Sequence, residues 1–98
     1  MASVADLVEP ESLRERAGEY LERAGQVLRE SGRVQLVELG PVRVLATVDD
    51  GGVRTVRLES GSDGLVVACD CEAPAASGWC PHAVATAIET WHRAPPRR

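Results

Sequence analysis

Hydrophobic residues of the N-terminal third recur every three or four positions. Between residues 11 and 30 these residues are Leu13, Ala17, Tyr20, Leu21, Ala24 and Leu28. This spacing predicts one long helix with a single buried stripe, in which Tyr20 anchors a helix–sheet contact. Gly18 and Gly25 weaken the helix, and Gly25 is the candidate position for a break, with Val27 already extended.

The residues before this helix leave two alternatives open. Ser3 and Asp6 have the spacing of a capping pair, which is typical of a short helical turn from Ser3 to Val8. A frayed terminus is the other alternative. Pro10 is suited to the first position of the helix that follows, because its missing N–H costs little there.

Residues 34–68 follow the alternating pattern of β-strands. Strands are expected at 34–39, 42–48, 53–58 and 65–68, separated by turns at Gly40-Pro41, Asp49–Gly52 and Ser60–Gly64. Because the connections are short, the strands form an antiparallel meander. A C-terminal helix follows, beginning near Pro81, with an apolar stripe of Val84, Ala87, Ile88 and Trp91. The predicted fold class is therefore α+β, in a single domain of residues 1–98 with its N-terminal helix at 11–30 and its meander at 34–68.

The candidate chemistry lies between the last strand and the last helix. Cys69, Cys71, Cys80 and His82 have the spacing C-x-C, eight residues, C-x-H, and they include every cysteine of the chain. Three thiolates and one imidazole form a complete tetrahedral ligand set for zinc, with no position left for water or substrate. An iron cluster favours an all-cysteine set. The pattern therefore favours one structural Zn²⁺.

Three alternatives compete with zinc. A disulfide framework cannot pair three cysteines within one chain, and a C-x-C disulfide is strained. Buried core cysteines account for Cys69 at a strand end, but not for all three beside a histidine. A catalytic Cys–His pair needs a third group to orient the base, and it leaves two cysteines without a role.

The spacing also predicts the local backbone. In a regular strand Cys69 and Cys71 point to opposite faces, so to share one metal the chain must leave strand geometry at Asp70 and form a knuckle. Pro81 suits the first position of the last helix, which places His82 in its first turn. Trp79 either shields the metal from water or is an exposed contact residue. His92 is expected to face solvent.

This segment resembles a SWIM-type zinc finger, whose pattern is C-x-C, a variable loop, then C-x-H. The resemblance covers residues 53–92 as a ββα finger, and Tyr20, Gly25 and Val27 are similar to the region before the finger in small bacterial SWIM proteins. It implies zinc ligands at Cys69, Cys71, Cys80 and His82. It also implies binding to proteins or DNA, since SWIM domains occur with helicase-like ATPases, transposases, recombination factors and ubiquitin-pathway proteins.

The chain departs from this pattern in its local charge. Asp70 and Glu72 stand where many members of the family have a small residue and proline, and Pro81 stands where many have lysine or arginine. The ligand set is intact, but acidic residues around the finger favour a protein partner over DNA. Asp70 and Glu72 are candidates for that contact, with a solvated loop as the alternative.

The overall charge favours the same conclusion. The formal net charge is −4, and all 11 basic residues are arginine. An acidic chain is a poor non-specific ligand for nucleic acid, because phosphate contacts supply most of that affinity. The chain shows no targeting signal and no apolar run of about 20 residues. Reduced cysteines that hold a metal are typical of a cytoplasmic protein.

We therefore expect a zinc-binding interaction module that docks onto a protein partner in a larger, nucleic-acid-processing assembly. The alternative is a nucleic-acid-binding finger that uses Arg43 and Arg57 on the sheet and Arg93, Arg97 and Arg98 near the C-terminus. We expect no enzymatic activity and no small-molecule substrate, since the sequence shows neither a Ser/His/Asp set nor a phosphate-binding loop. An enzyme is only a remote alternative.

Overall fold

Alternating residues and short turns build a four-stranded antiparallel sheet. The computed structural model describes residues 3–61, 64–70 and 79–93. The strands pair in the order β1-β2-β3-β4, which confirms the predicted meander. Their bounds are β1 Val34–Leu39, β2 Arg43–Asp49, β3 Val53–Gly61 and β4 Gly64–Cys69.

One face of this sheet carries the core. Val44, Ala46 and Val48 of β2 are fully buried, and the cross-strand partners of the first two, Leu58 and Val56 on β3, are buried beside them. The alternation predicts these residues on one face, but it also places Val42 with them, and Val42 precedes β2 and is 53% exposed. β1 departs from regular pairing at a bulge between Leu36 and Glu38, and Val37 inside it is 66% exposed. A bulge of this kind interrupts an edge strand.

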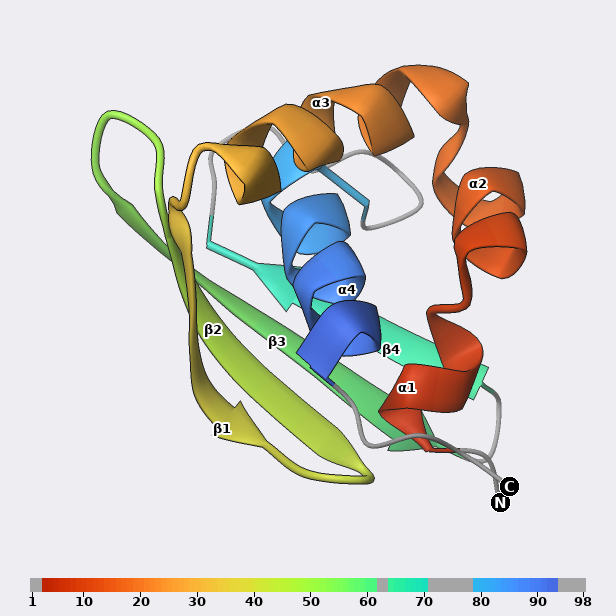
Figure 1. The fold of residues 1–98 in the computed structure, drawn as a ribbon. Helices are drawn as coiled ribbons and strands as arrows, with labels where there is room; N and C mark the ends of the chain where they lie inside the picture. The colour runs from red at the N-terminus through yellow and green to blue at the C-terminus, as the bar shows by residue number, and fades with distance from the viewer. Residues whose placement is uncertain (1–2, 62–63, 71–78, 94–98) are drawn as a thin grey trace.

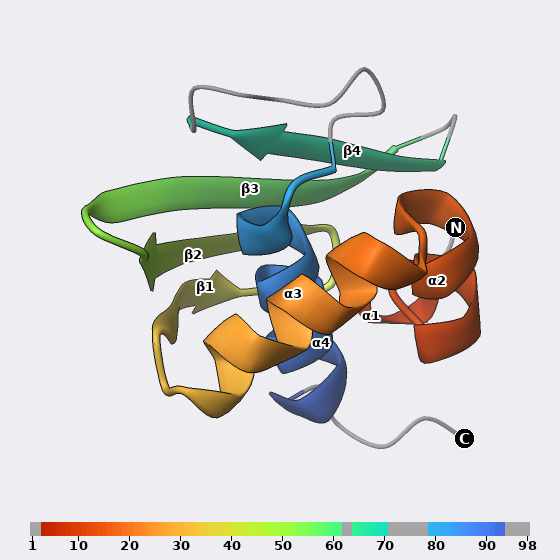
Figure 2. The ribbon, with the colours of Figure 1, turned by 90° about the horizontal axis from the view of Figure 1, so that it is seen from above.

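Helix α4, Pro81–Arg93, is the centre of the molecule. It lies against the inner face of the sheet, and α3 crosses it on the other side (Figures 1 and 2). Every residue from 82 to 90 is buried as a result, so the helix buries far more than the predicted stripe. Its buried hydroxyls are satisfied within the helix, because Thr86 Oγ1 donates to the His82 carbonyl at 3.0 Å and Thr90 Oγ1 to the Thr86 carbonyl at 2.8 Å.

Three helices precede the sheet. They are α1 Val4–Leu7, α2 Pro10–Ala17 and α3 Glu19–Glu30. In α1, Ser3 and Asp6 form a reciprocal capping box, so the helical turn, and not the frayed terminus, is correct for these residues. Pro10 occupies the start of α2 as predicted.

The prediction of a helix that breaks at Gly25 is wrong. The break is at Gly18, whose φ of 93° lies outside the helical region and is readily adopted only by glycine. Gly25 lies in the middle of α3, where it is buried against α4, and Val27 is helical. The sequence alone does not distinguish the two glycines, because only the packing of α3 on α4 shows that Gly25 lies inside a helix.

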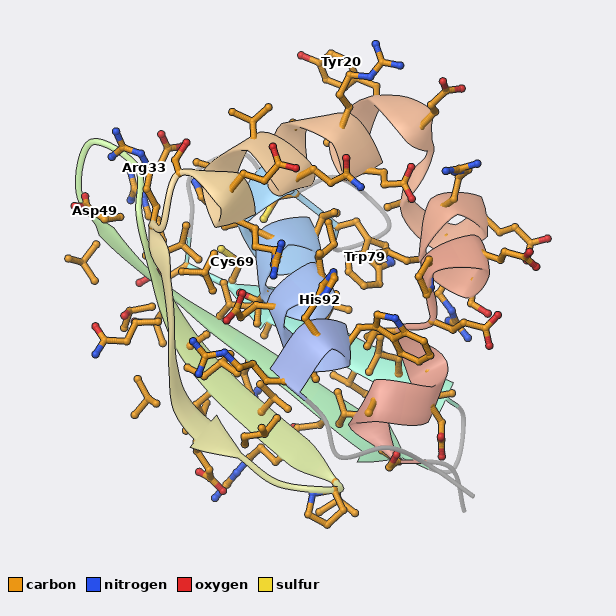
Figure 3. All side chains as sticks on the ribbon, viewed as in Figure 1. Tyr20, Arg33, Asp49, Cys69, Trp79 and His92 are labelled. Atoms are coloured by element: carbon orange, nitrogen blue, oxygen red, sulfur yellow. The ribbon has the colours of Figure 1, made fainter. Side chains whose placement is uncertain are left out.

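The predicted role of Tyr20 as a core anchor is also wrong. Its side chain is 83% exposed and projects away from the body of the molecule (Figure 3). Helix α3 packs mainly on α4 and not on the sheet, through the side that carries Leu21, Gly25 and Leu28. Tyr20 lies about 100° around the helix from Leu21 and faces solvent.

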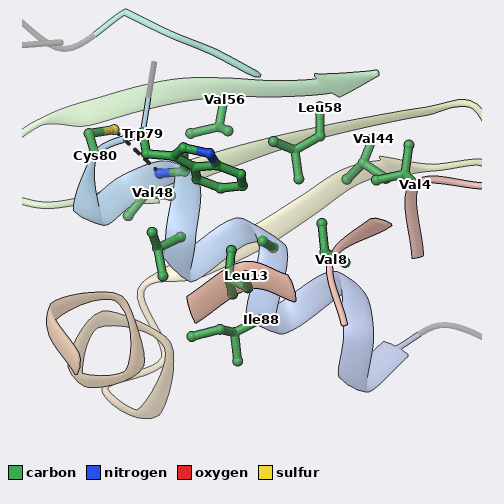
Figure 4. Packing of buried hydrophobic residues seen from close by; sticks show 13 residues of the cluster. Val4, Val8, Leu13, Val44, Val48, Val56, Leu58, Trp79, Cys80 and Ile88 are labelled. Carbon is green, nitrogen blue, oxygen red and sulfur yellow. Dashed lines mark hydrogen bonds between the residues drawn. The ribbon is translucent and has the colours of Figure 1, made fainter. Parts of the chain in front are cut away.

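A single cluster of buried residues connects α1, α2, the sheet and α4 (Figure 4). Its members are Val4, Val8, Leu13, Val44, Val48, Val56, Leu58, Trp79, Cys80, Ala83, Val84, Ala87 and Ile88. No helix among the described residues has the length and apolar character needed to cross a membrane.

Candidate metal site

Two separate segments bring three metal-ligating side chains together. Cys69 is the last residue of β4, while Cys80 and His82 lie at the start of α4. One ligand atom from each of the three residues lies within 4.8 Å of the other two. His82 Nδ1 is 3.9 Å from Cys69 Sγ and 3.8 Å from Cys80 Sγ. Neither of these cysteines is in a disulfide, so the disulfide alternative is wrong for this pair.

These separations fit a tetrahedral metal centre. With Zn–S near 2.3 Å and Zn–N near 2.0 Å, two ligand atoms of a tetrahedral site lie about 3.5–3.8 Å apart. The observed nitrogen–sulfur distances are close to this range. All three ligand atoms lie within 4.8 Å of one another, which is compact enough for one ion to contact each of them. Soft sulfur with imidazole nitrogen is a donor set that suits zinc.

Cys80 stands at the N-cap position, directly before α4. Its Sγ accepts a hydrogen bond from the Ala83 N–H at 3.4 Å, and its carbonyl accepts from the Val84 N–H at 3.0 Å. Only 3% of Cys80 is exposed. The positive end of the α4 dipole favours a negatively charged sulfur here. Pro81 is the first helical residue and His82 the second, as predicted.

Cys69 reaches the site because the chain leaves the sheet immediately after it. Cys69 pairs with the buried Val56, so its side chain lies on the α4 side of the sheet. At the next position the Asp70 N–H donates to the Thr55 carbonyl at 3.2 Å, and Asp70 Oδ1 accepts from the Thr55 N–H at 3.0 Å. The Asp70 carboxylate thus accepts the hydrogen bond that a backbone carbonyl would accept in a continuing strand. Asp70 therefore has a local structural role, and its side chain remains exposed.

The remaining predicted ligand, Cys71, lies outside the described residues, as does Glu72. The described part of the site is therefore a group of three ligands, Cys69, Cys80 and His82. This group is the full set of ligand candidates that the sequence placed in the described part of the chain.

The surroundings of the site are apolar on one side. Trp79 is only 4% exposed and lies in the core beside Cys80 (Figure 4), so its interpretation as an exposed contact residue is wrong. His82 itself is 8% exposed. His92 is exposed and stands apart from the group, as predicted.

One residue beside the candidate ligands is not part of the cysteine–histidine motif. Asp50, in the turn between β2 and β3, has its Oδ2 2.9 Å from His82 Nε2. Thirty-two positions separate the two residues, and no motif connects them. The sequence indicated only that Asp50 lies in an Asp-Asp-Gly-Gly turn at the end of a half-buried strand.

The chain was compared with protein-family models, with curated proteins and with solved structures. None of the three comparisons gives a match.

Proposed function

We propose that this chain is a zinc-stabilised interaction module of the SWIM type. One Zn²⁺ is held by Cys69, Cys71, Cys80 and His82. The single observation that carries the proposal is the convergence of Cys69 Sγ, Cys80 Sγ and a His82 ring nitrogen within 4.8 Å. The sequence supplies a fourth ligand of the same kind two residues after Cys69.

The proposed role of the metal is structural. It would join the end of β4 to the start of α4, and α4 is the helix on which both α3 and the sheet pack. Small zinc domains derive much of their folding free energy from such a site, because the ligands are not assembled in the unfolded chain. Four protein ligands leave no exchangeable position for a substrate, so the proposal does not include catalysis.

The charged side chains favour a protein partner over nucleic acid. The two sheet arginines that were candidates for phosphate contacts each face a carboxylate on the same sheet. Arg43 lies 3.4 Å from Glu38, and Arg57 lies 3.4 Å from Glu59. A phosphate would have to replace these pairs, on a chain with a formal net charge of −4. The broader role, docking within a nucleic-acid-processing assembly in the cytoplasm, rests on the SWIM resemblance.

Chelation tests the metal half of the proposal. Dialysis of the purified protein against a zinc chelator should lower its melting temperature and its helical circular dichroism signal, and added Zn²⁺ should restore both. Mg²⁺ at the same concentration is the control, because it prefers oxygen ligands. A melting curve that is identical with and without the chelator contradicts a structural zinc.

A DNA titration tests the choice of partner. Fluorescence anisotropy with labelled single-stranded and duplex oligonucleotides should give no Kd below about 10 μM at near-physiological salt. A tighter Kd that weakens steeply between about 50 and 200 mM salt would replace the protein-docking proposal with nucleic-acid binding.

A further inference from the structure

We propose that Asp50 is a positioning residue of the metal site, which holds the His82 ring so that Nδ1 binds the metal. The proposal rests on the proposed function, because it assumes that the Cys–His group takes up zinc. It adds a third segment, the β2–β3 turn, to a site that the motif alone places between β4 and α4.

The two ring nitrogens of His82 face different partners. Nε2 lies 2.9 Å from Asp50 Oδ2, while Nδ1 lies 3.9 Å from Cys69 Sγ and 3.8 Å from Cys80 Sγ. A neutral imidazole carries one proton, and the nitrogen without it has the lone pair that a metal needs. A carboxylate accepts hydrogen bonds and so selects the form protonated on Nε2. That form presents the Nδ1 lone pair to the two sulfurs.

The fold places Asp50 by the same alternation that builds the core. Val48 is fully buried on the α4 side of β2, and Asp50, two residues later, continues on that side. The chain then reverses at Gly51, whose φ of 73° favours glycine, and the Asp50 N–H donates to the Gly52 carbonyl at 3.0 Å. β3 begins opposite β2 with Val53 paired to Asp49. The turn therefore presents one carboxylate to the start of α4.

An ion pair without any metal role is the competing interpretation. In that case Asp50 would contact a protonated His82, and its removal would affect the metal-free protein. As a positioning residue, Asp50 acts instead on metal affinity and on the choice of ring nitrogen. Mutation of a residue that hydrogen-bonds a metal-bound histidine typically lowers metal affinity by about 10- to 100-fold.

The experiment compares Zn²⁺ affinity, measured by competition with a chromophoric chelator, across four proteins. These are the wild type, Asp50→Ala, Asp50→Asn and Asp49→Ala. Asp50→Ala removes the acceptor and should weaken Zn²⁺ binding by about 10- to 100-fold. Asp50→Asn keeps an oxygen that accepts from Nε2–H and should retain part of the affinity. Asp49→Ala removes the same charge from the neighbouring position and should bind as the wild type does.

Nitrogen-15 NMR of the histidine rings supplies a readout that a general loss of stability does not change. The chain has two histidines, and His92→Gln assigns the signal of His82. In the zinc form, Nδ1 should carry the metal and Nε2 the proton. Circular dichroism of the metal-free variants shows whether each variant folds as the wild type does without metal.

The outcomes separate the two proposals. A wild type that takes up no Zn²⁺ overturns the proposed function, and the role of Asp50 falls with it. If the wild type binds Zn²⁺ and Asp50→Ala binds it equally tightly, only the role of Asp50 is overturned. The same holds if the zinc in the wild type is bound to Nε2 of His82. Equal losses in Asp50→Ala and Asp49→Ala also overturn that role, because they indicate an effect of charge alone.

Discussion

Gly25 of α3 lies directly against Val84 of α4. A Cβ built at residue 25 would come within 2.5 Å of Val84 Cγ1 and 2.9 Å of the Ala85 backbone nitrogen. The absence of a side chain thus lets two helices approach closely, and α4 is enclosed between α3 and the sheet. The same helix carries two of the metal-ligand candidates at its first turn, Cys80 immediately before it and His82 within it. Packing of α3 and assembly of the metal site therefore depend on the position of one helix.

Gly25→Ala should destabilise the domain although alanine is the better helix former. The added methyl has to displace Val84 or move the helices apart, which costs about 1–3 kcal/mol in a packed core. Chemical denaturation followed by circular dichroism measures the difference. Gly52→Ala is the control, since its Cβ would meet nothing within 4 Å and its backbone has no positive φ. Equal stabilities of the two variants would contradict this packing.

Glu89→Ala should destabilise the domain more than the removal of an exposed glutamate does. Glu89 is 8% exposed and joins two arginines, with Oε1 3.1 Å from Arg29 Nε and Oε2 2.8 Å from Arg93 Nε. Charge-assisted hydrogen bonds of this kind contribute about 1.5–3 kcal/mol. Glu19→Ala breaks the exposed pair with Arg23 and should cost less than about 1 kcal/mol. If Glu89→Ala is as stable as Glu19→Ala, the Arg29–Glu89 ion pair does not stabilise the contact between α3 and α4.

Cys80→Ser should separate the two roles of Cys80. Serine still caps α4 by accepting from the Ala83 N–H, so the metal-free protein should be no less stable than the wild type. With zinc present, the variant loses a soft ligand and with it the zinc-dependent stabilisation, which for the wild type reaches about 2.7 kcal/mol at 100 times Kd. Cys80→Ala should lose the cap as well, at about 0.5–2 kcal/mol without metal. Thermal melts with and without Zn²⁺ measure both effects, and full zinc stabilisation of Cys80→Ser would exclude Cys80 as a ligand.

Zinc removal should loosen the two ends of the site before it loosens the sheet. The bonds from the Val84 N–H to the Cys80 carbonyl and from the Asp70 N–H to the Thr55 carbonyl flank the candidate ligands. Hydrogen exchange at Val84 and Asp70 should accelerate most on chelation, because local opening there no longer costs the metal bonds. The centre of the β2–β3 ladder is the internal reference. Acceleration that is uniform along the chain would indicate global destabilisation instead.

Much of the fold could be predicted from local pattern. Val44, Ala46 and Val48 are buried as their alternation requires, and the capping box of Ser3 follows from two residues at the correct spacing. The C-x-C and C-x-H motifs likewise identified three side chains that the fold brings together. In each case the information lies within a few residues of the chain.

The features that escaped prediction depend on contacts between distant segments. Periodicity shows that α3 has a buried side but not that this side meets α4, so it assigns Tyr20 to the core. It also could not reveal that α4 is enclosed on both sides, which buries Thr86 and Thr90. The contact between Asp50 and His82 joins the β2–β3 turn to the start of α4, and these two segments meet only in the assembled fold.

Native mass spectrometry of the purified protein, combined with elemental analysis, measures directly whether the Cys–His group holds one zinc. We expect one zinc per chain, retained under native conditions and lost on acid denaturation. A chain that carries no metal, and whose three cysteines all react with a thiol reagent under native conditions, would contradict this expectation.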